Sequence, residues 1–116
     1  MREDFDKFLP LSPAVLHILL ALSGEERHGY GIMQEVARQS DHKYKLGPGT
    51  LYDNLEKLLD HGVVEESPRR SSADDPPRRY YRLTGFGRRL LATEIARLEG
   101  VVREARLHLR VRPERA

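Results

Sequence analysis

The sequence predicts a mainly α-helical domain that carries one small β-hairpin and ends in a long helix. Apolar residues recur at helical spacing in four separate segments. The strand-like segments, 63–67 and 78–83, flank a stretch with three prolines in ten residues, 68–77. A seven-residue repeat of apolar positions then fills the last third of the chain. A length of 116 residues suits one domain of this kind.

The composition points to a protein of the reducing cytoplasm. The chain has no cysteine, which excludes a disulfide framework and a thiolate metal site. Its longest apolar run, 14–22, is interrupted by His17 and is too short to span a bilayer. The acidic N-terminus lacks the apolar core of an export signal. We therefore expect a cytoplasmic location and no membrane contact.

The net charge of +2 is divided unevenly along the chain. Residues 1–61 hold seven basic and ten acidic side chains, a balance of −3. Residues 62–83 hold five and four, and residues 84–116 hold eight and four, so the positive charge lies in the C-terminal half. This asymmetry is compatible with an anionic partner such as nucleic acid.

The first half of the chain predicts an arm and two helices. Residues 1–11 form the arm, and Ser12 followed by Pro13 is a helix-start signal. The helix that follows, to about Gly24, is apolar nearly all round, which predicts a central position. His17 within it has no partner at ligand spacing, so we expect a packed or surface-tip histidine rather than a metal ligand. A polar turn at 25–29 leads to a second helix at 30–39, and 40–46 form a loop.

A third helix is predicted from Gly47, its N-cap, to Gly62, which can adopt the left-handed conformation that ends a helix. Four leucines form its apolar stripe: Leu51, Leu55, Leu58 and Leu59. The opposite face begins with small and hydroxyl side chains, Gly49 and Thr50, which would let a large partner approach the backbone. The same face carries Asp53, Glu56 and Asp60 against Lys57, a balance of −2.

The second half predicts the hairpin and the long helix. Thr84 should cap this helix, and Phe86, Leu90 and Val101 should pack on the body of the domain. The heptad positions have no partner left in so short a chain, which favours a second subunit; the alternative is that they fold back on the N-terminal helix. The expected dimer interface consists of Leu91, Ile95, Leu98, Val102, Ala105 and Leu109. Residues from about 110 should form a frayed basic tail.

This element order is that of a winged helix-turn-helix domain, residues 1–83 with a wing loop at 68–77, followed by a dimerisation helix and tail, 84–116. Three motifs stand at matching separations: Gly-Tyr-Gly-Ile at 29–32, Pro-Gly-Thr-Leu-Tyr at 48–52, and Arg-Tyr-Tyr-Arg-Leu-Thr-Gly-Phe-Gly-Arg at 79–88. With them the chain resembles the PadR family of bacterial transcriptional regulators, in its shorter form with a single C-terminal helix. The likeness covers nearly all of 11–109.

The resemblance implies a homodimer that binds double-stranded DNA at a pseudo-palindromic operator and usually represses nearby genes. The third helix would enter the major groove, and the wing would follow the backbone or minor groove. Many members release DNA on binding a small, often aromatic molecule, so an apolar or aromatic effector is a possible partner. The expected DNA contacts are Lys43, Lys45, Pro48, Gly49, Thr50, Tyr52, Asp53, Lys57, Arg69, Arg70, Arg78 and Arg79. The acidic C-terminal half of the third helix should stand away from the groove, leaving 48–53 to read bases.

Several details stay open at this stage. Tyr52 lies beside the leucine stripe, so its hydroxyl could contact phosphate or its ring could belong to the core. Tyr80 and Tyr81 alternate along the second strand, so one should be buried and the other exposed.

Other functions are less well supported by the residues. The five histidines are scattered, and no HxxxH pair, phosphate loop or serine elbow is present, so we expect neither an enzyme nor a metal or other cofactor. A winged helix that binds only protein is the main alternative. RNA recognition is disfavoured because the tyrosines do not form one stacking platform.

Overall fold

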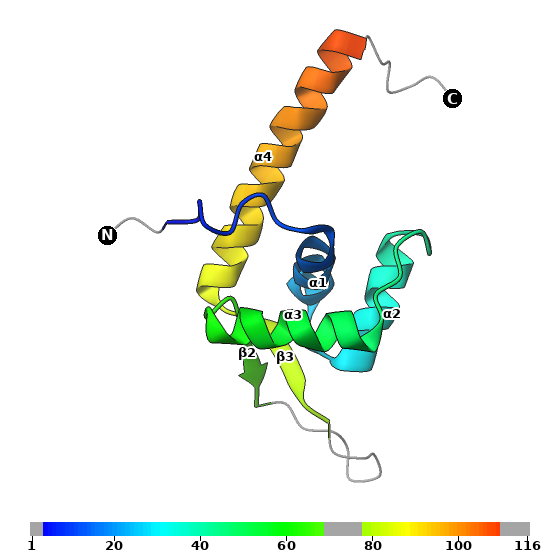
Figure 1. The fold of residues 1–116 in the computed structure, drawn as a ribbon, viewed down its shortest axis with the longest axis vertical. Coiled ribbons are helices and arrows are strands. Elements are labelled where there is room, and N and C mark those ends of the chain that lie inside the picture. Colours follow the sequence, from blue (N-terminus) through cyan, green and yellow to red (C-terminus); the bar gives the residue numbers. More distant parts are fainter. Residues whose placement is uncertain (1–3, 69–77, 110–116) are drawn as a thin grey trace.

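A computed structural model describes residues 4–68 and 78–109 of the chain. It confirms a mainly helical fold with a small sheet and a long last helix (Figure 1). In chain order the elements are α1 (Pro13–Gly24), β1 (Arg27–His28), α2 (Gly29–Gln39), α3 (Pro48–Asp60), β2 (Val64–Ser67), β3 (Tyr80–Leu83) and α4 (Gly85–Leu109). Within the described residues, no helix is both long enough and apolar enough to cross a membrane.

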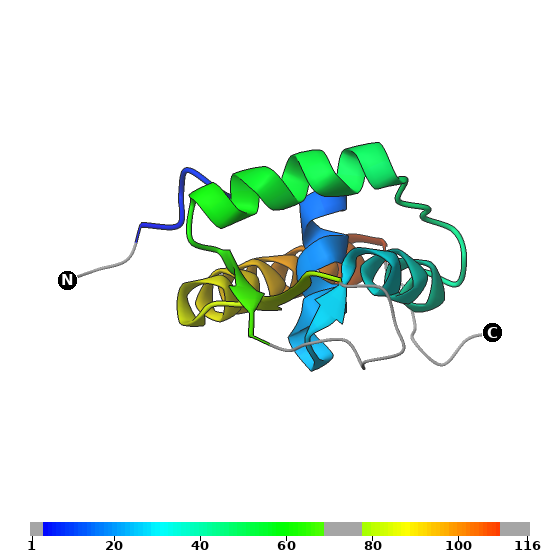
Figure 2. The same ribbon diagram turned by 90° about the horizontal axis from the view of Figure 1, so that it is seen from below.

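Helix α1 is the centre of the domain, as its apolar sequence predicted. The Ser12 hydroxyl accepts a hydrogen bond from the Val15 backbone N–H (3.2 Å), which fixes the start of the helix. The side chains of Ile18 and Leu19 are fully buried, and α2, α3, α4 and β3 all pack against α1 (Figure 2). The other elements are therefore positioned through this one helix.

Helices α2 and α3 form the helix-turn-helix pair. Their buried faces hold the leucines of α3 and two residues of α2: Leu51, Leu55, Leu58, Ile32 and Val36. The predicted end of α3 is confirmed, since Gly62 has a φ of 72°. Leu59 was wrongly placed in the apolar stripe and is 36% exposed. It follows Leu58 by about 100° of helix rotation, which carries it past the edge of the buried face.

The sheet has three strands, in the order β1-β3-β2, where the sequence predicted a two-stranded hairpin. Residues 27–28 were expected in a turn, but Arg27 and His28 pair antiparallel with Tyr81 and Tyr80. On the other side of β3, the register runs from Val64 opposite Leu83 to Ser67 opposite Tyr80. A strand of two residues shows no alternation in sequence, so β1 could be recognised only from its partner. The predicted wing loop falls largely outside the described residues, at 69–77.

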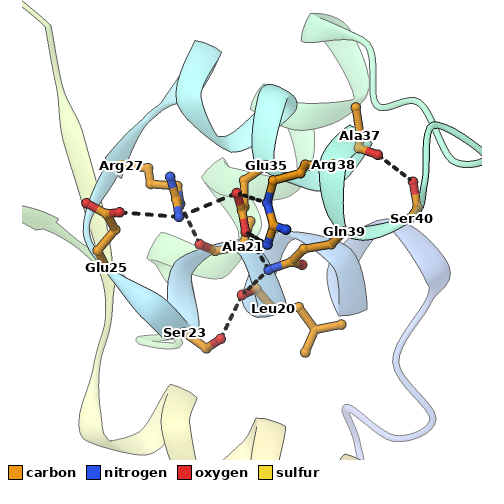
Figure 3. A network of polar contacts seen from close by, with 10 residues as sticks. All are labelled: Leu20, Ala21, Ser23, Glu25, Arg27, Glu35, Ala37, Arg38, Gln39 and Ser40. Carbon is orange, nitrogen blue, oxygen red and sulfur yellow. Dashed lines mark hydrogen bonds and ion pairs between the residues drawn. The ribbon is translucent and has the colours of Figure 1, made fainter.

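A polar network ties the C-terminal end of α1 to α2 (Figure 3). Arg38 donates two hydrogen bonds to the Glu35 carboxylate (2.9 and 2.7 Å), and Gln39 donates a third (2.9 Å). Arg27 donates to the Ala21 carbonyl oxygen (2.8 Å) and lies 3.6 Å from Glu35. Chiefly through the Arg38 hydrogen bonds, which outweigh the opposing effect of burial, the pKa of Glu35 is lowered to about 2.

The N-terminal arm packs over α4 and the end of α3, on the side of α3 away from the sheet (Figure 1). The Phe8 ring meets the rings of Phe86 and His61 edge to face, at centroid distances of 5.7 and 5.6 Å. The Leu11 N–H donates to the carboxylate of Glu94 (2.9 Å), which is only 1% exposed. Arg97 binds the same carboxylate through two hydrogen bonds (2.6 and 3.1 Å) and holds the pKa of Glu94 below its usual value. The sequence did not indicate this ion pair between the buried Glu94 and the exposed Arg97.

Helix α4 begins as predicted, with the Thr84 hydroxyl accepting from the Gly87 N–H (2.9 Å). Its first turns pack on the domain, whereas its C-terminal half projects beyond the body (Figure 1). Two expectations about its faces were therefore wrong. Leu91 is buried in the core of its own subunit (7% exposed) and is not free to contact another chain. Val101, expected to pack on the body, is 52% exposed because the body ends before it.

Candidate nucleic-acid interface

The N-terminal end of α3 presents an open backbone surface. Pro48, Gly49, Thr50 and Asp53 are all exposed, and apart from the adjoining residues and backbone of α3 itself, no atom lies within 4 Å of where a Gly49 side chain would begin. Gly47 is the N-cap and offers no side-chain acceptor, so the first backbone N–H groups of the helix remain available to an anion. Figure 2 shows α3 lying across one outer face of the domain. These features suit close approach of a large, negatively charged partner.

The sequence left open whether Tyr52 is exposed for a phosphate contact or belongs to the core, and the structure shows a partly exposed side chain that packs on α2. Its side chain is 49% exposed, and its phenol rests directly on the Gly29 backbone at the start of α2. A methyl group at Gly29 would collide with the Tyr52 hydroxyl and ring. The glycine of the first motif and the tyrosine of the second are therefore two halves of one contact. Tyr52 therefore contacts the start of α2 and remains about half exposed.

A hollow of about 460 Å³ lies next to this contact, and we call it the wing hollow. It is bordered by the end of β1, the start of α2, Tyr52 of α3, and the residues that lead into β3. The lining consists of His28, Gly29, Tyr30, Tyr52, Arg78, Arg79 and Tyr81. Two guanidinium groups and three phenols thus surround one depression, and its described lining contains no carboxylate. Such a lining attracts an anion and offers it several hydrogen-bond donors.

His28 joins the start of α2 to the border of this hollow. Its Nδ1 accepts the Gly31 backbone N–H (3.0 Å) and caps α2. Its Nε2 lies 2.8 Å from a guanidinium nitrogen of Arg78. His28 therefore links the N-terminal end of α2 to the segment that leads into β3. Sequence reasoning missed His28 and Tyr30, although a histidine directly before a Gly-Tyr-Gly helix start is a possible N-cap.

One of the two tyrosines of β3 is buried, as predicted, but the other is not fully exposed. Tyr81 is 6% exposed, whereas Tyr80 is half-buried and its ring lies edge to face with His28 at 5.3 Å. Burial raises the pKa of the Tyr81 hydroxyl above its ordinary value near 10, and the neighbouring Arg79 partly offsets this effect. Tyr81 thus stays neutral at the floor of the wing hollow.

Lys43 and Lys45 extend from a well-supported loop just before α3. The Ser40 hydroxyl accepts the Tyr44 N–H (3.0 Å), and the Tyr44 ring stacks on His17 at 4.5 Å. His17 is thus a packed histidine, as expected. Asp41 and His42, with φ values of 54° and 61°, make the tight turn that ends α2. Both lysines are exposed near the N-terminus of α3.

The other predicted contacts are distributed differently. Lys57 lies on the flank of α3 that faces the N-terminal arm, in a cavity it shares with Phe8 and His61, and so apart from the wing hollow. The exposed row Asp53, Glu56 and Asp60 follows the outer face of α3 toward its C-terminus. Arg69 and Arg70 lie outside the described residues. The structure therefore brings together Tyr52, Arg78 and Arg79, and it sets Lys57 apart.

The C-terminal half of α4 carries the remainder of the heptad stripe. Val102 and Leu109 are 49% and 71% exposed, Ala105 is exposed, and Leu98 is half-exposed. A shallow groove of about 430 Å³ follows this stripe and is lined by Ile95, Leu98, Glu99, Val102, Arg103 and Arg106. Elsewhere in the described chain, no group of three histidine or carboxylate side chains is arranged to hold a metal ion.

The helix order, the three-stranded antiparallel sheet and the long last helix define a winged helix-turn-helix protein. Residues 15–93 match the Transcriptional regulator PadR-like family, and the chain belongs to that family. It is 38% identical over 89 residues to the transcriptional regulator Rv3488 of Mycobacterium tuberculosis, a match that covers 77% of this chain and 78% of that protein.

Solved structures show the same fold. A PadR family transcription regulator from Clostridium difficile aligns with a TM-score of 0.71 at 18% identity, covering 84% of this chain and 99% of that one. A PadR-like regulator from Bacillus cereus gives 0.70 at 22% identity, with 84% and 92% covered. PadR of Bacillus subtilis, solved in complex with operator DNA, gives 0.60 at 23% identity, with 70% of this chain and 45% of that chain covered.

Proposed function

We propose that this family member regulates transcription as a homodimer that binds double-stranded DNA. The wing hollow beside the open start of α3 is the observation that carries the proposal. It places two arginines, three tyrosines and His28 beside the exposed N-terminal end of α3, the helix that we expect in the major groove of DNA. The structural likeness to Bacillus subtilis PadR, which was solved in complex with operator DNA, also supports DNA binding by this fold.

In this proposal, α3 enters the major groove by its first turns only. Thr50 can donate to or accept from a base edge, and Asp53 can accept from a cytosine amino group. The acidic row behind Asp53 would be repelled by phosphates, so the C-terminal half of α3 tilts out of the groove. Lys43 and Lys45 on one side, and Arg78, Arg79 and Tyr52 on the other, bind the flanking phosphates.

The exposed stripe on α4 supports the dimer. Leu98, Val102, Ala105 and Leu109 repeat at intervals of four and three residues, the period of a helix that packs against another helix. A two-fold dimer presents two copies of α3, and it therefore recognises an operator with matching pseudo-palindromic symmetry. Repression of nearby genes in the cytoplasm, relieved by a small apolar molecule, is the regulatory mode that we propose.

A protein-binding winged helix is the second candidate, and the acidic outer face of α3 favours it. Fluorescence anisotropy with a labelled random-sequence duplex separates the two functions. At about 50 mM salt, a DNA-binding dimer should bind the duplex, and its affinity should fall steeply toward about 200 mM. A protein-only module should give no anisotropy change at either salt concentration, and that result would refute our proposal.

The same assay tests individual phosphate contacts. We expect Lys43→Ala and Arg79→Ala each to weaken binding to any sequence, and to reduce the salt slope of log affinity by about 1. Lys7→Ala is the matched control, since it removes one positive charge from the arm on the far side of α3. An unchanged affinity and slope for Arg79→Ala would remove the wing hollow from the interface.

A further inference from the structure

A group of polar side chains crosses the sheet at the base of the hairpin formed by β2 and β3. Strands alternate their side chains between two faces, and Val64, Tyr81 and Leu83 occupy the face that packs on the core. The other face holds charged and hydroxyl side chains from β2, from β3 and from the residue directly before β1. We call this group the wing-base cluster, and it consists of Glu26, Glu65, Ser67 and Arg82.

Arg82, on the central strand β3, joins the two sides of the sheet. Its Nε donates to the carboxylate of Glu65 on β2 (2.8 Å), and a terminal guanidinium nitrogen lies 3.6 Å from the carboxylate of Glu26. The same Glu26 oxygen accepts the hydroxyl of Ser67, the last residue of β2. Glu26 therefore reaches across β3 and holds both strands of the hairpin from the segment that leads from α1 into β1.

The wing-base cluster adjoins the residues that bring positive charge to the wing hollow. Ser67 is paired with Tyr80, and Arg78 and Arg79 directly precede Tyr80 in the chain. His28, two residues after Glu26, contacts the Tyr80 ring and lies 2.8 Å from Arg78. A hairpin base held in this way presents the two arginines at one fixed place relative to the start of α2.

The exposure of the cluster indicates a role in geometry more than in stability. The side chains of Arg82, Glu65 and Glu26 are 41%, 47% and 31% exposed, and ion pairs this open to water contribute little to the free energy of folding. Two carboxylates near a DNA-binding surface also repel phosphates. We propose that Glu26 and Arg82 are positioning residues, which hold the hairpin so that Arg78 and Arg79 reach phosphate. This role rests on the proposed function.

Substitution of Glu26 separates position from charge. Glu26→Ala and Glu26→Gln remove the same negative charge, but glutamine keeps an oxygen that can accept the Ser67 hydroxyl. Charge alone predicts tighter DNA binding by both variants, because each removes a group that repels phosphate. We expect Glu26→Ala instead to weaken binding to a random-sequence duplex about threefold to tenfold in the anisotropy assay, and Glu26→Gln to stay within about twofold of wild type. Glu25→Ala is the matched control: it makes the same charge change one position earlier, on a carboxylate that pairs with Arg27, and it should not weaken binding.

A double-mutant cycle shows whether Glu26 acts through the arginines. In a background that carries Arg78→Ala and Arg79→Ala, Glu26→Ala should change the affinity less than about twofold, because the groups that it positions are gone. General damage to the fold would weaken binding equally in both backgrounds. Amide hydrogen exchange without DNA is the independent measurement: Glu26→Ala should speed exchange at 65–67 and 80–82 about tenfold and leave α1 unchanged.

Three results would each overturn the inference. Glu26→Ala binds the duplex as tightly as wild type or more tightly; or its loss of affinity is the same with and without the two arginines; or hydrogen exchange at the base of the hairpin is unchanged. A wild-type protein that binds no duplex would refute the proposed function itself, and the positioning role with it. Wild-type binding together with one of the three results refutes the positioning role alone.

Discussion

Gly29 and Tyr52 show how single residues set the geometry of the candidate interface. They lie on α2 and α3, and the phenol of one occupies the space above the backbone of the other. The motifs that contain them were visible in the sequence, whereas their mutual contact was not, because the 22 positions between them carry no signal of spatial proximity. His28 was missed for a related reason, since its N-cap role depends on the exact start of α2.

Replacing Gly29 with alanine tests this contact. The new methyl group displaces Tyr52, so we expect Gly29→Ala to lower the free energy of unfolding by about 1–3 kcal/mol and to weaken DNA binding. Urea denaturation measures the first effect. Gly31→Ala is the matched control, because the nearest side-chain atom to its new methyl is at an ordinary 3.4 Å and alanine favours the helix. If Gly29→Ala lowers the free energy of unfolding by as much in a Tyr52→Ala background as in the wild type, the collision with Tyr52 is not the cause.

Glu35 gives the fold a pH dependence. Its pKa is about 2 in the folded protein against an ordinary value of 4.5, so its charge stabilises the fold above about pH 4.5. That contribution is lost as the pH falls from about 4.5 to about 2. We expect Glu35→Gln to lower the free energy of unfolding at pH 7 by about 1–2 kcal/mol, allowing for screening by solvent. The variant's stability should also depend less on pH between about 2 and 4.5. A variant with the same acid-unfolding profile as wild type would contradict the assignment.

At the scale of elements, hydrophobic periodicity in the sequence was sufficient to locate the helices. The four helices lie where the apolar spacing placed them, and the caps Ser12 and Thr84 act as expected. Features that depend on a partner segment were missed. Strand β1 exists only through its pairing with β3, and Leu91 was assigned to a free stripe although the body of the same chain buries it. Periodicity shows that a face is apolar and does not show what covers it.

The second half of α4 is the element on which dimerisation should depend. We expect Leu98→Glu to dissociate the dimer, because a carboxylate buried at a helix–helix contact is strongly unfavourable without a partner. Sedimentation equilibrium measures the change in mass. Leu107→Glu is a suitable control, since Leu107 is 67% exposed and lies outside the heptad stripe. A Leu98→Glu protein that still sediments as a dimer would place the subunit contact elsewhere.

At the scale of the whole molecule, the binding surfaces occupy different sides of one framework. The wing hollow is bordered by β1, α2 and the residues that lead into β3, whereas the cavity that Lys57 shares with Phe8 and His61 lies against the N-terminal arm. The apolar stripe is on the C-terminal half of α4. The general arrangement of helix-turn-helix, wing and terminal helix was predictable from the sequence. The segregation of Lys57 from Tyr52 and the arginines was not, because it depends on how the arm packs against α3.

The most direct test of the account is selection of duplexes from a random-sequence DNA pool with the full-length protein as bait, followed by sequencing of the bound fraction. If a two-fold dimer inserts the start of α3 into successive major grooves, the enriched sequences should contain an inverted repeat with half-site centres about one helical turn, or a multiple of it, apart. Substitution of Thr50 with alanine should relax the preference at one position of each half-site. A pool that shows no enrichment, or an enriched motif without two-fold symmetry, would contradict the proposal.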